Sequence, residues 1–218
     1  MRTFIWSRIL RECLRLIIDP LKDGISSVEL IDHMGNDLSV VNAARVSYNK
    51  ASIEYNGKDA KLIRYLMRNK HGSPFEHTCF TFRVRAPLFV VHQWERHRIA
   101  SYNEESGRYI QLEAQFYVRP NENRKVREEK FRADYDLYLS LLESGETKEQ
   151  ARDVLPMALY KSYWFTVNAR ALMNFLTLRT DDHAQEEIRR YANAVESFWG
   201  AVMPDTWAAW NELGRIAP

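Results

Sequence analysis

An alternation of side chains along residues 78–85 constrains the fold of this chain most. Apolar and polar residues take turns there, with Phe80, Phe82 and Val84 on one side and Thr81, Arg83 and Arg85 on the other. Successive side chains of a strand point to opposite faces, so the run predicts a strand with one buried and one exposed face. Pro87 suits the first turn of a following helix, which we expect over residues 88–98.

The remaining periodic segments predict a few strands and several helices. Further strands are expected at 28–34 and 160–167, and helices at 37–45, 58–69, 169–178 and 184–202. Residues 99–119 have no clear period. Residues 121–150 are highly charged and carry a helical apolar stripe that Gly145 ends, which is typical of a peripheral helical excursion. The pattern therefore predicts one mixed α/β domain.

The composition of the chain is that of a soluble protein and gives no sign of a nucleic-acid-binding, membrane-bound or disulfide-rich protein. The 218 residues are 45% hydrophobic and 28% charged, which is typical of a soluble globular domain. A net charge of +2 gives no reason to expect nucleic acid or an anionic membrane as a partner. Cys13 and Cys79 form no CxxC pair, so we expect a reducing, cytoplasmic location.

The N-terminal residues 1–18 mix apolar and charged side chains. Their apolar positions follow helical spacing, and the charges interrupt any signal-peptide core. We expect an amphipathic helix that packs on the body or on a neighbouring subunit, and a membrane-surface helix is the alternative. No stretch reaches the ~18 uncharged apolar residues of a membrane span.

The segment 93–109 concentrates the chemistry. It holds three Arg, one His, three Glu and a Ser-Gly pair. Arginine forks and backbone N–H groups beside a glycine are the donors that a phosphate needs. An anion-binding site is one interpretation. Ordinary charges at a helix end, followed by a turn, are the other.

This segment resembles the signature of flavin-dependent thymidylate synthases. Arg96-His97-Arg98 is followed, after seven residues, by Ser106, and the run continues through Arg108 and Tyr109. Segments 43–48, 71–77, 166–179 and 183–185 also resemble that family, in the expected order. The resemblance covers about residues 28–203. It implies an enzyme domain at 28–218, with the helical excursion at about 121–150, and leaves residues 1–27 as the N-terminal amphipathic segment that their own spacing predicts.

The resemblance also implies a fold and a reaction. The family fold is α+β, with a central, mostly antiparallel sheet flanked by helices. The family reaction methylates dUMP to dTMP, with methylenetetrahydrofolate as carbon donor and FAD, reduced by NADPH, as hydride carrier. Members are homotetramers with shared active sites. The chain has no GxGxxG after a strand, so we expect no Rossmann site.

The family's site residues map onto this sequence one by one. Arg179 is the implied catalytic residue, lying against the uracil and favouring its N3-deprotonated form. The implied nucleotide-binding residues are Gln93, Arg96, Glu104, Ser106, Gly107, Arg108, Arg152 and Arg179. The implied flavin-binding residues are Ser73, Arg96, His97, Arg98, Glu104, Asn168, Arg170 and Asn174. Ser106 is interpreted as a phosphate ligand because no base is placed to activate it as a nucleophile.

Simpler structural roles stay open for some of these residues. Asn168 could only cap the following helix. Arg170 and Asn174, four residues apart, could be a solvated pair. Arg179 points to the apolar side of its helix and needs an anionic partner. That partner is either a carboxylate, such as Asp181 or Asp182, or a ligand.

Three rival functions are open to the same sequence. An RNA-binding module could use the arginines and aromatic rings, but the charge is small and no RNA motif is present. A metal site could be sought among His71, His77, His92, His97 and His183, but their spacing matches no known pattern, so we expect no metal. The third rival is a family member that has lost its activity.

Overall fold

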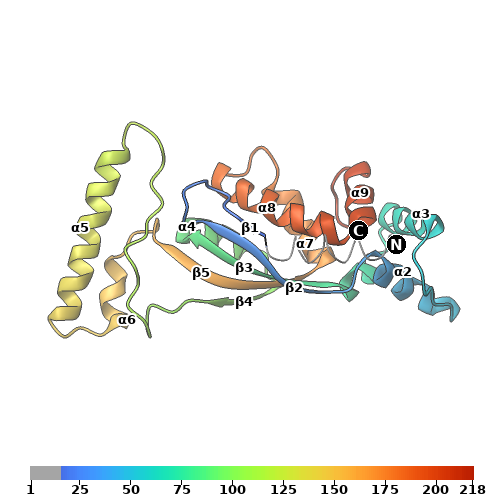
Figure 1. The fold of residues 1–218 in the computed structure, drawn as a ribbon, viewed down its shortest axis with the longest axis horizontal. Coiled ribbons are helices and arrows are strands. Elements are labelled where there is room, and N and C mark those ends of the chain that lie inside the picture. The colour runs from blue at the N-terminus through green and yellow to red at the C-terminus, as the bar shows by residue number, and fades with distance from the viewer. Residues whose placement is uncertain (1–15) are drawn as a thin grey trace.

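The computed structural model describes residues 16–218, and its centre is one antiparallel sheet (Figure 1). The strands lie in the order β1-β2-β3-β5-β4, and every neighbouring pair is antiparallel. Their bounds are β1 Ile17–Ile18, β2 Ser27–Met34, β3 Cys79–Pro87, β4 Ser101–Glu104 and β5 Tyr160–Asn168. Helices flank the sheet, so the α+β fold class is confirmed.

The two faces of the sheet differ as the alternation in β3 predicts. Phe80, Phe82 and Val84 are fully buried, and helices α7 (Ala169–Arg179) and α8 (Glu186–Val202) lie over this face (Figure 1). The opposite face is mostly polar, apart from the exposed Trp164 of β5, and carries the Arg83–Glu29 ion pair, 2.8 Å between Nη2 and Oε2. Burial of the aromatic face therefore fixes which side of the sheet the helices cover.

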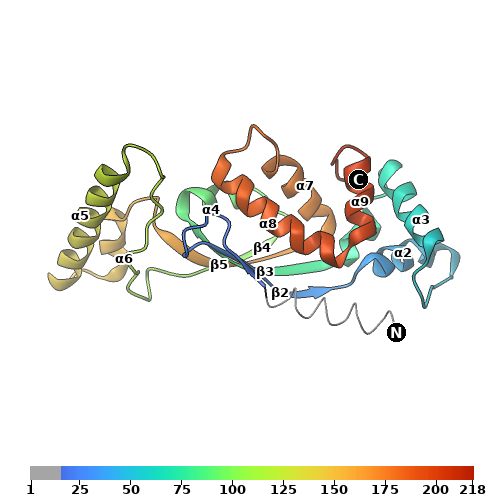
Figure 2. The same cartoon turned by 45° about the horizontal axis from the view of Figure 1, so that its top comes forward.

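Three helices gather at one end of the molecule (Figure 2). They are α2 (Asp37–Arg45), α3 (Gly57–Arg68) and α9 (Pro204–Glu212), and a short 3-10 turn, η1 (Val46–Tyr48), follows α2. Buried Asp37 accepts hydrogen bonds from the backbone N–H groups of Asp205 and Thr206, each at 3.0 Å. A carboxylate at the start of α9 satisfies donors that the helix itself cannot pair, and so ties α2 to α9.

Helix α5 (Arg124–Glu143) projects at the other end, with α6 (Lys148–Ala151) and the 3-10 turn η3 (Arg152–Val154) beside it (Figure 1). Its predicted apolar stripe faces the chain segment around Leu112. Buried Tyr138 accepts from the Leu112 N–H at 3.3 Å, and Tyr135 donates to the Leu112 carbonyl at 3.0 Å. Gly145 follows the helix with φ of +98°, as expected for a helix stop.

Several predicted boundaries are wrong. Helix α4 spans only Leu88–Trp94, and Pro87 is its N-cap, so the Arg-His-Arg triplet lies in the loop beyond it. Residues 99–119 contain β4, which the sequence pattern does not predict. Helix α8 begins two residues later than expected, at Glu186. The C-terminal tail with Trp207 and Trp210 forms α9, which the pattern also leaves unassigned.

The expected N-terminal helix falls mostly outside the described residues, because the structure describes the chain from residue 16. Ile17 and Ile18, at its predicted end, form strand β1 and pair with Glu29 and Val28. That part of the helix prediction is wrong. Unsatisfied edge groups of β2 offer Ile17 and Ile18 backbone partners, which outweigh the helical spacing of their side chains.

Candidate active site

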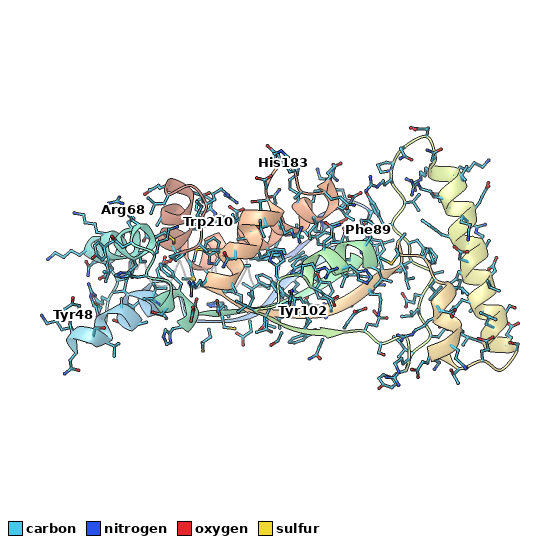
Figure 3. All side chains as sticks on the ribbon, turned by 180° about the vertical axis from the view of Figure 1, so that it is seen from behind. Tyr48, Arg68, Phe89, Tyr102, His183 and Trp210 are labelled. Carbon is cyan, nitrogen blue, oxygen red and sulfur yellow. The ribbon has the colours of Figure 1, made fainter. Side chains whose placement is uncertain are left out.

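The loop after α4 is held by the aromatic core beneath it. Trp94, the last residue of α4, is fully buried and stacks on Phe175 of α7 at 4.7 Å between ring centroids. The Tyr102 hydroxyl of β4 lies between two carbonyl oxygens of this region, 2.9 Å from His97 and 3.2 Å from Trp94. Figure 3 shows Tyr102 beside the sheet. The packing of Trp94 and the hydrogen bonds of Tyr102 therefore both hold the start of the Arg-His-Arg loop in place.

Arg179 and His97 meet at the C-terminal end of α7. Arg179 donates from Nε to His97 Nε2 at 3.0 Å and from Nη2 to the Gln93 carbonyl at 2.9 Å. An arginine does not lose its proton, so His97 must be neutral and accept at Nε2. Burial, together with the Arg179 charge, lowers the pKa of His97 to about 4. The Arg179 cation therefore donates to two neutral acceptors, the His97 ring and the Gln93 carbonyl.

No carboxylate of the described chain neutralises Arg179. Of the two candidates from the sequence, Asp181 binds His183 and Asp182 pairs with Arg189, each at 2.9 Å. Burial lowers the pKa of the half-buried Arg179 guanidinium, but the group stays charged at neutral pH. Its charge is stabilised by backbone carbonyls at helix ends and remains available to an anionic ligand.

Arg96 and Arg98 flank His97 in the loop. Both are exposed, and neither has an ion-pair partner within residues 16–218. Glu104, by contrast, forms an ion pair with the nearly buried Lys161 of β5. The loop therefore presents two free guanidinium groups around a half-buried neutral imidazole.

A second cluster gathers at the N-terminal end of α7. The Asn168 Oδ1 accepts from the Ala171 N–H at 2.9 Å, which is the helix cap that the sequence offered as a simpler role. Arg170 donates to the Pro218 carbonyl at 2.8 Å and pairs with Glu76 at 2.6 Å. Asn174 Nδ2 lies 3.4 Å from the Arg170 carbonyl.

The start of the 3-10 turn η2 (Ser73–His77) lies against this cluster. A β-carbon on Gly72 would approach Arg170 Nε to 2.4 Å, so only glycine lets the turn come so close. Exposed Ser73 follows directly. The structure thus brings Ser73, Arg170 and Asn168 to one end of α7.

A third cluster forms where the turn after β4 meets α6. The Ser106 hydroxyl accepts from the Arg108 N–H at 3.3 Å, and Arg108 pairs with Glu149 at 3.2 Å. A β-carbon on Gly107 would lie 2.7 Å from Leu112 Cδ1 and 3.3 Å from Arg152 Cδ. Arg152 therefore lies against the turn. Ser106 and Gly107 are thus grouped with two arginines, Arg108 and Arg152.

The three clusters are separate within one chain. No hydrogen bond or ion pair of the described residues joins Arg179 and Gln93 to the turn at 106–108. In Figure 1, α6 lies near one end of the long axis, α4 and α7 lie in the middle, and α2 lies towards the other end. The predicted nucleotide-binding residues are thus split between two places in the molecule.

The structure shows where the histidines lie that could have formed a metal site. Within the part of the chain that the structure describes, no group of three or more His, Cys, Asp or Glu side chains is arranged to hold a metal ion. His183 is 98% exposed at the outer surface (Figure 3), whereas His97 contacts Arg179. Over the same residues, none of the helices combines the length and the apolar character that a membrane crossing requires.

The comparisons with known proteins decide the family. The family model described as thymidylate synthase complementing protein matches residues 29–205. A flavin-dependent thymidylate synthase from Thermotoga neapolitana is 51% identical over 193 residues, which cover 84% of this chain and 89% of that protein. This chain belongs to the flavin-dependent thymidylate synthase family.

Other relatives of this thymidylate synthase family extend the match. A flavin-dependent thymidylate synthase from Tropheryma whipplei is 40% identical and covers 95% of this chain and 99% of its own. The crystal structure of a UMP/dUMP methylase from Streptomyces cacaoi, bound with 5-Br dUMP, has a TM-score of 0.83 and 39% identity. It covers 88% of this chain and 97% of that one. The chain is therefore an enzyme of the methyltransferase class.

Two features of this family member are not predictable from its sequence. Tyr102 lies inside the recognised motif, but nothing in the motif indicates that its hydroxyl contacts two carbonyl groups. Gln185 donates to Glu187 and accepts from Gln93. Its place in the family-like run 183–185 is the only signal that could draw attention to it.

Proposed function

We propose that the enzyme converts dUMP to dTMP by reductive methylation, with methylenetetrahydrofolate as carbon donor and FAD, reduced by NADPH, as hydride carrier. The names of its relatives and the 5-Br dUMP bound to the Streptomyces cacaoi methylase support this assignment. The observation that carries it is Arg179, a half-buried cation with neutral hydrogen-bond partners and no carboxylate among the described residues.

The residues of the Arg-His-Arg loop suit a flavin dinucleotide. Exposed Arg96 and Arg98 have no carboxylate partner in the described chain and can bind a pyrophosphate. Ser73, His97, Glu104, Asn168, Arg170 and Asn174 complete the proposed flavin-binding set. The bound flavin supplies the hydride, and the protein supplies binding, orientation and charge.

Arg179 would act on the uracil ring. A fixed cation against the ring favours the N3-deprotonated form and raises electron density at C5, the carbon to be methylated. His97 and the Gln93 carbonyl hold the guanidinium in place before the nucleotide arrives. Preorganised charge of this kind needs no rearrangement during the reaction.

The turn at 106–108 would bind the phosphate of dUMP. Ser106, the backbone at Gly107 and the guanidinium groups of Arg108 and Arg152 lie together and provide several donors. Gln93, Arg96 and Glu104 would add further contacts to the nucleotide. Glu149 holds Arg108 at 3.2 Å at the surface, so phosphate would compete with that pair.

A homotetramer with shared sites would unite these groups. One dUMP molecule must contact both Arg179, the last residue of α7, and the turn at 106–108, which pairs with Glu149 of α6, and α7 and α6 lie apart within one chain (Figure 1). A site completed by a second subunit resolves this separation. We assign the enzyme to the cytoplasm, as expected for a protein with no disulfide framework.

An absorbance experiment tests the proposal. The purified protein is reduced with NADPH without oxygen, and dUMP and methylenetetrahydrofolate are then added. Flavin bands should bleach on reduction and return only when both substrates are present, with dTMP formed. A colourless protein that binds no added FAD would overturn the assignment and favour the RNA-binding alternative.

A further inference from the structure

The side-chain amide of Gln93 is held at one end only. Its Nε2 group donates to Gln185 Oε1 at 2.7 Å and lies 3.2 Å from the carbonyl oxygen of Phe89. Its Oε1 has no hydrogen-bond partner among the described residues. The backbone carbonyl of the same residue accepts from Arg179. Gln93 therefore connects Arg179 to a further group of side chains.

That group runs from α4 to the start of α8. Gln185, the N-cap residue of α8, donates from Nε2 to Glu187 Oε2 at 2.8 Å. Glu187 is 4% exposed, and its Oε1 pairs with Arg119 at 2.9 Å. The chain of contacts from Gln93 through Gln185 and Glu187 to Arg119 is a continuous relay of hydrogen bonds.

The direction of this relay is fixed at both ends. The two ends of an amide have the same shape, so neighbours must decide which end is oxygen. The carboxylate of Glu187 only accepts, which orients Gln185 with its oxygen towards Gln93. The Phe89 carbonyl also only accepts, which orients Gln93 in the same sense. Both constraints leave Oε1 of Gln93 as the free end.

We infer that Gln185 and Glu187 are positioning residues that, together with the Phe89 carbonyl, make Gln93 present its Oε1 as an acceptor to a donor group of the nucleotide. This inference rests on the proposed function, because it takes Gln93 as a nucleotide-binding residue. It assigns a role to a buried carboxylate and an amide that contact neither flavin nor nucleotide in the proposed site. Loss of direction in the relay should weaken nucleotide binding without changing the chemical step.

A simpler explanation for Glu187 is that it stabilises the first turn of α8 by its charge. Glu186 lies in the same turn and pairs only with Arg190 at the surface, so it is a matched control. Glu187→Gln removes the fixed direction of the relay, because an amide at position 187 can either donate a hydrogen bond to Gln185 or accept one from it. Gln185→Leu removes the relay. The double substitution Gln185→Glu with Glu187→Gln restores it, since the carboxylate moved to the N-cap position would accept from both neighbouring amides.

The experiment measures the dUMP dissociation constant by calorimetry, together with KM and kcat, for the holoenzyme and these variants. We expect Gln185→Leu and Glu187→Gln to raise KM and the dissociation constant roughly 3- to 10-fold, the effect of about one net hydrogen bond. Values of kcat, flavin content and melting temperature should stay near those of the wild type. Glu186→Gln should change neither constant, and the double swap should recover most of the loss.

Two results would overturn the inference. One is an unchanged dUMP affinity in Gln185→Leu and Glu187→Gln. The other is a control that fails: an equal effect of Glu186→Gln would show a general helix effect, and no recovery in the double swap would show that the direction of the relay does not matter. A wild-type enzyme that forms no dTMP would instead refute the proposed function, so the two failures are distinguishable.

Discussion

The two ends of α7 each carry an arginine of the proposed site, in opposite electrostatic surroundings. Near the N-terminal end, Arg170 pairs with the Glu76 carboxylate at 2.6 Å. At the C-terminal end, the hydrogen-bond partners of Arg179 within residues 16–218 are the neutral His97 ring and the Gln93 carbonyl. The charge of Arg170 is balanced by a carboxylate of the protein, whereas the charge of Arg179 is not. We therefore expect Arg170 to hold a ligand and Arg179 to act on the reacting ring.

The difference follows from what surrounds each helix end. Partial negative charge collects at a helix C-terminus, so Arg179 can be half-buried there without a carboxylate. Partial positive charge collects at an N-terminus, where Arg170 needs Glu76 and the Pro218 carbonyl to be stable. The same helix thus provides one arginine whose charge is balanced by a carboxylate and one whose charge is not.

The largest effect should come from Arg179→Ala. Removing the Arg179 cation, which we place against the uracil, should lower the rate of dTMP formation about 10²- to 10³-fold, the usual cost of losing one charge-stabilising donor. Initial rates at saturating substrates measure this. Arg189→Ala, which removes an arginine paired with Asp182 at the surface, is the control and should change the rate less than about 2-fold. A similarly small loss of rate in Arg179→Ala would show that its unbalanced charge does not act in the reaction.

A smaller and different effect is expected for Arg170→Ala. Flavin affinity should fall roughly tenfold through loss of one charge-assisted hydrogen bond, while kcat at saturating flavin stays within about 2-fold. Gly72→Ala should act in the same direction, because its β-carbon would lie 2.4 Å from Arg170 Nε. Flavin titration followed by fluorescence gives both values. A collapse of kcat with normal flavin binding would contradict a holding role.

Ser106→Ala tests a cluster remote from both ends of α7. We expect the KM for dUMP to rise roughly 3- to 10-fold, because one phosphate donor of several is lost, while turnover remains. Steady-state kinetics and dUMP binding measure this. Complete loss of turnover with dUMP binding intact would show instead that Ser106 takes part in the chemistry.

The smallest effect concerns pH. The pKa of His97 is lowered to about 4 by burial and by Arg179, so the ring stays neutral from about pH 5 upwards. Unfolded chains protonate this histidine near 6.5. Its contribution to stability is therefore complete above pH 6.5 and lost as pH falls towards 4. A His97→Gln variant should flatten that part of the curve of melting temperature against pH, and an unchanged curve would contradict a neutral His97.

Some of the fold could be predicted from the sequence and some could not. The β3 alternation and the amphipathic α3 are predictable because one period determines each of them. Strand β4 is not, because Ser101–Glu104 pairs with β5 alone and has no alternating apolar side chains. Helix α4 ends earlier than its sequence indicates. Arg179, which is distant in sequence, and Tyr102, eight residues beyond Trp94, bind the carbonyl groups of Gln93 and Trp94 at that end.

The sequence offered candidate site residues but not their geometry. The resemblance to the family named Arg179, Ser106 and Arg170 as candidates, and these roles remain predictions. It could not show that Arg179 rests on His97, because that contact joins two segments 82 positions apart. Nor could it show that Asp181 and Asp182 turn to other partners.

The central claim is that the Arg179 charge acts on the uracil N3. The most direct test is an NMR titration of dUMP labelled with ¹⁵N at N3, bound to the holoenzyme, with Arg179→Gln as comparison. We expect bound N3 to lose its proton at least about one pH unit below free dUMP, an interaction of about 1.4 kcal/mol. In Arg179→Gln, the titration should return towards that of the free nucleotide. Bound N3 in the wild type that titrates like free dUMP would contradict the account.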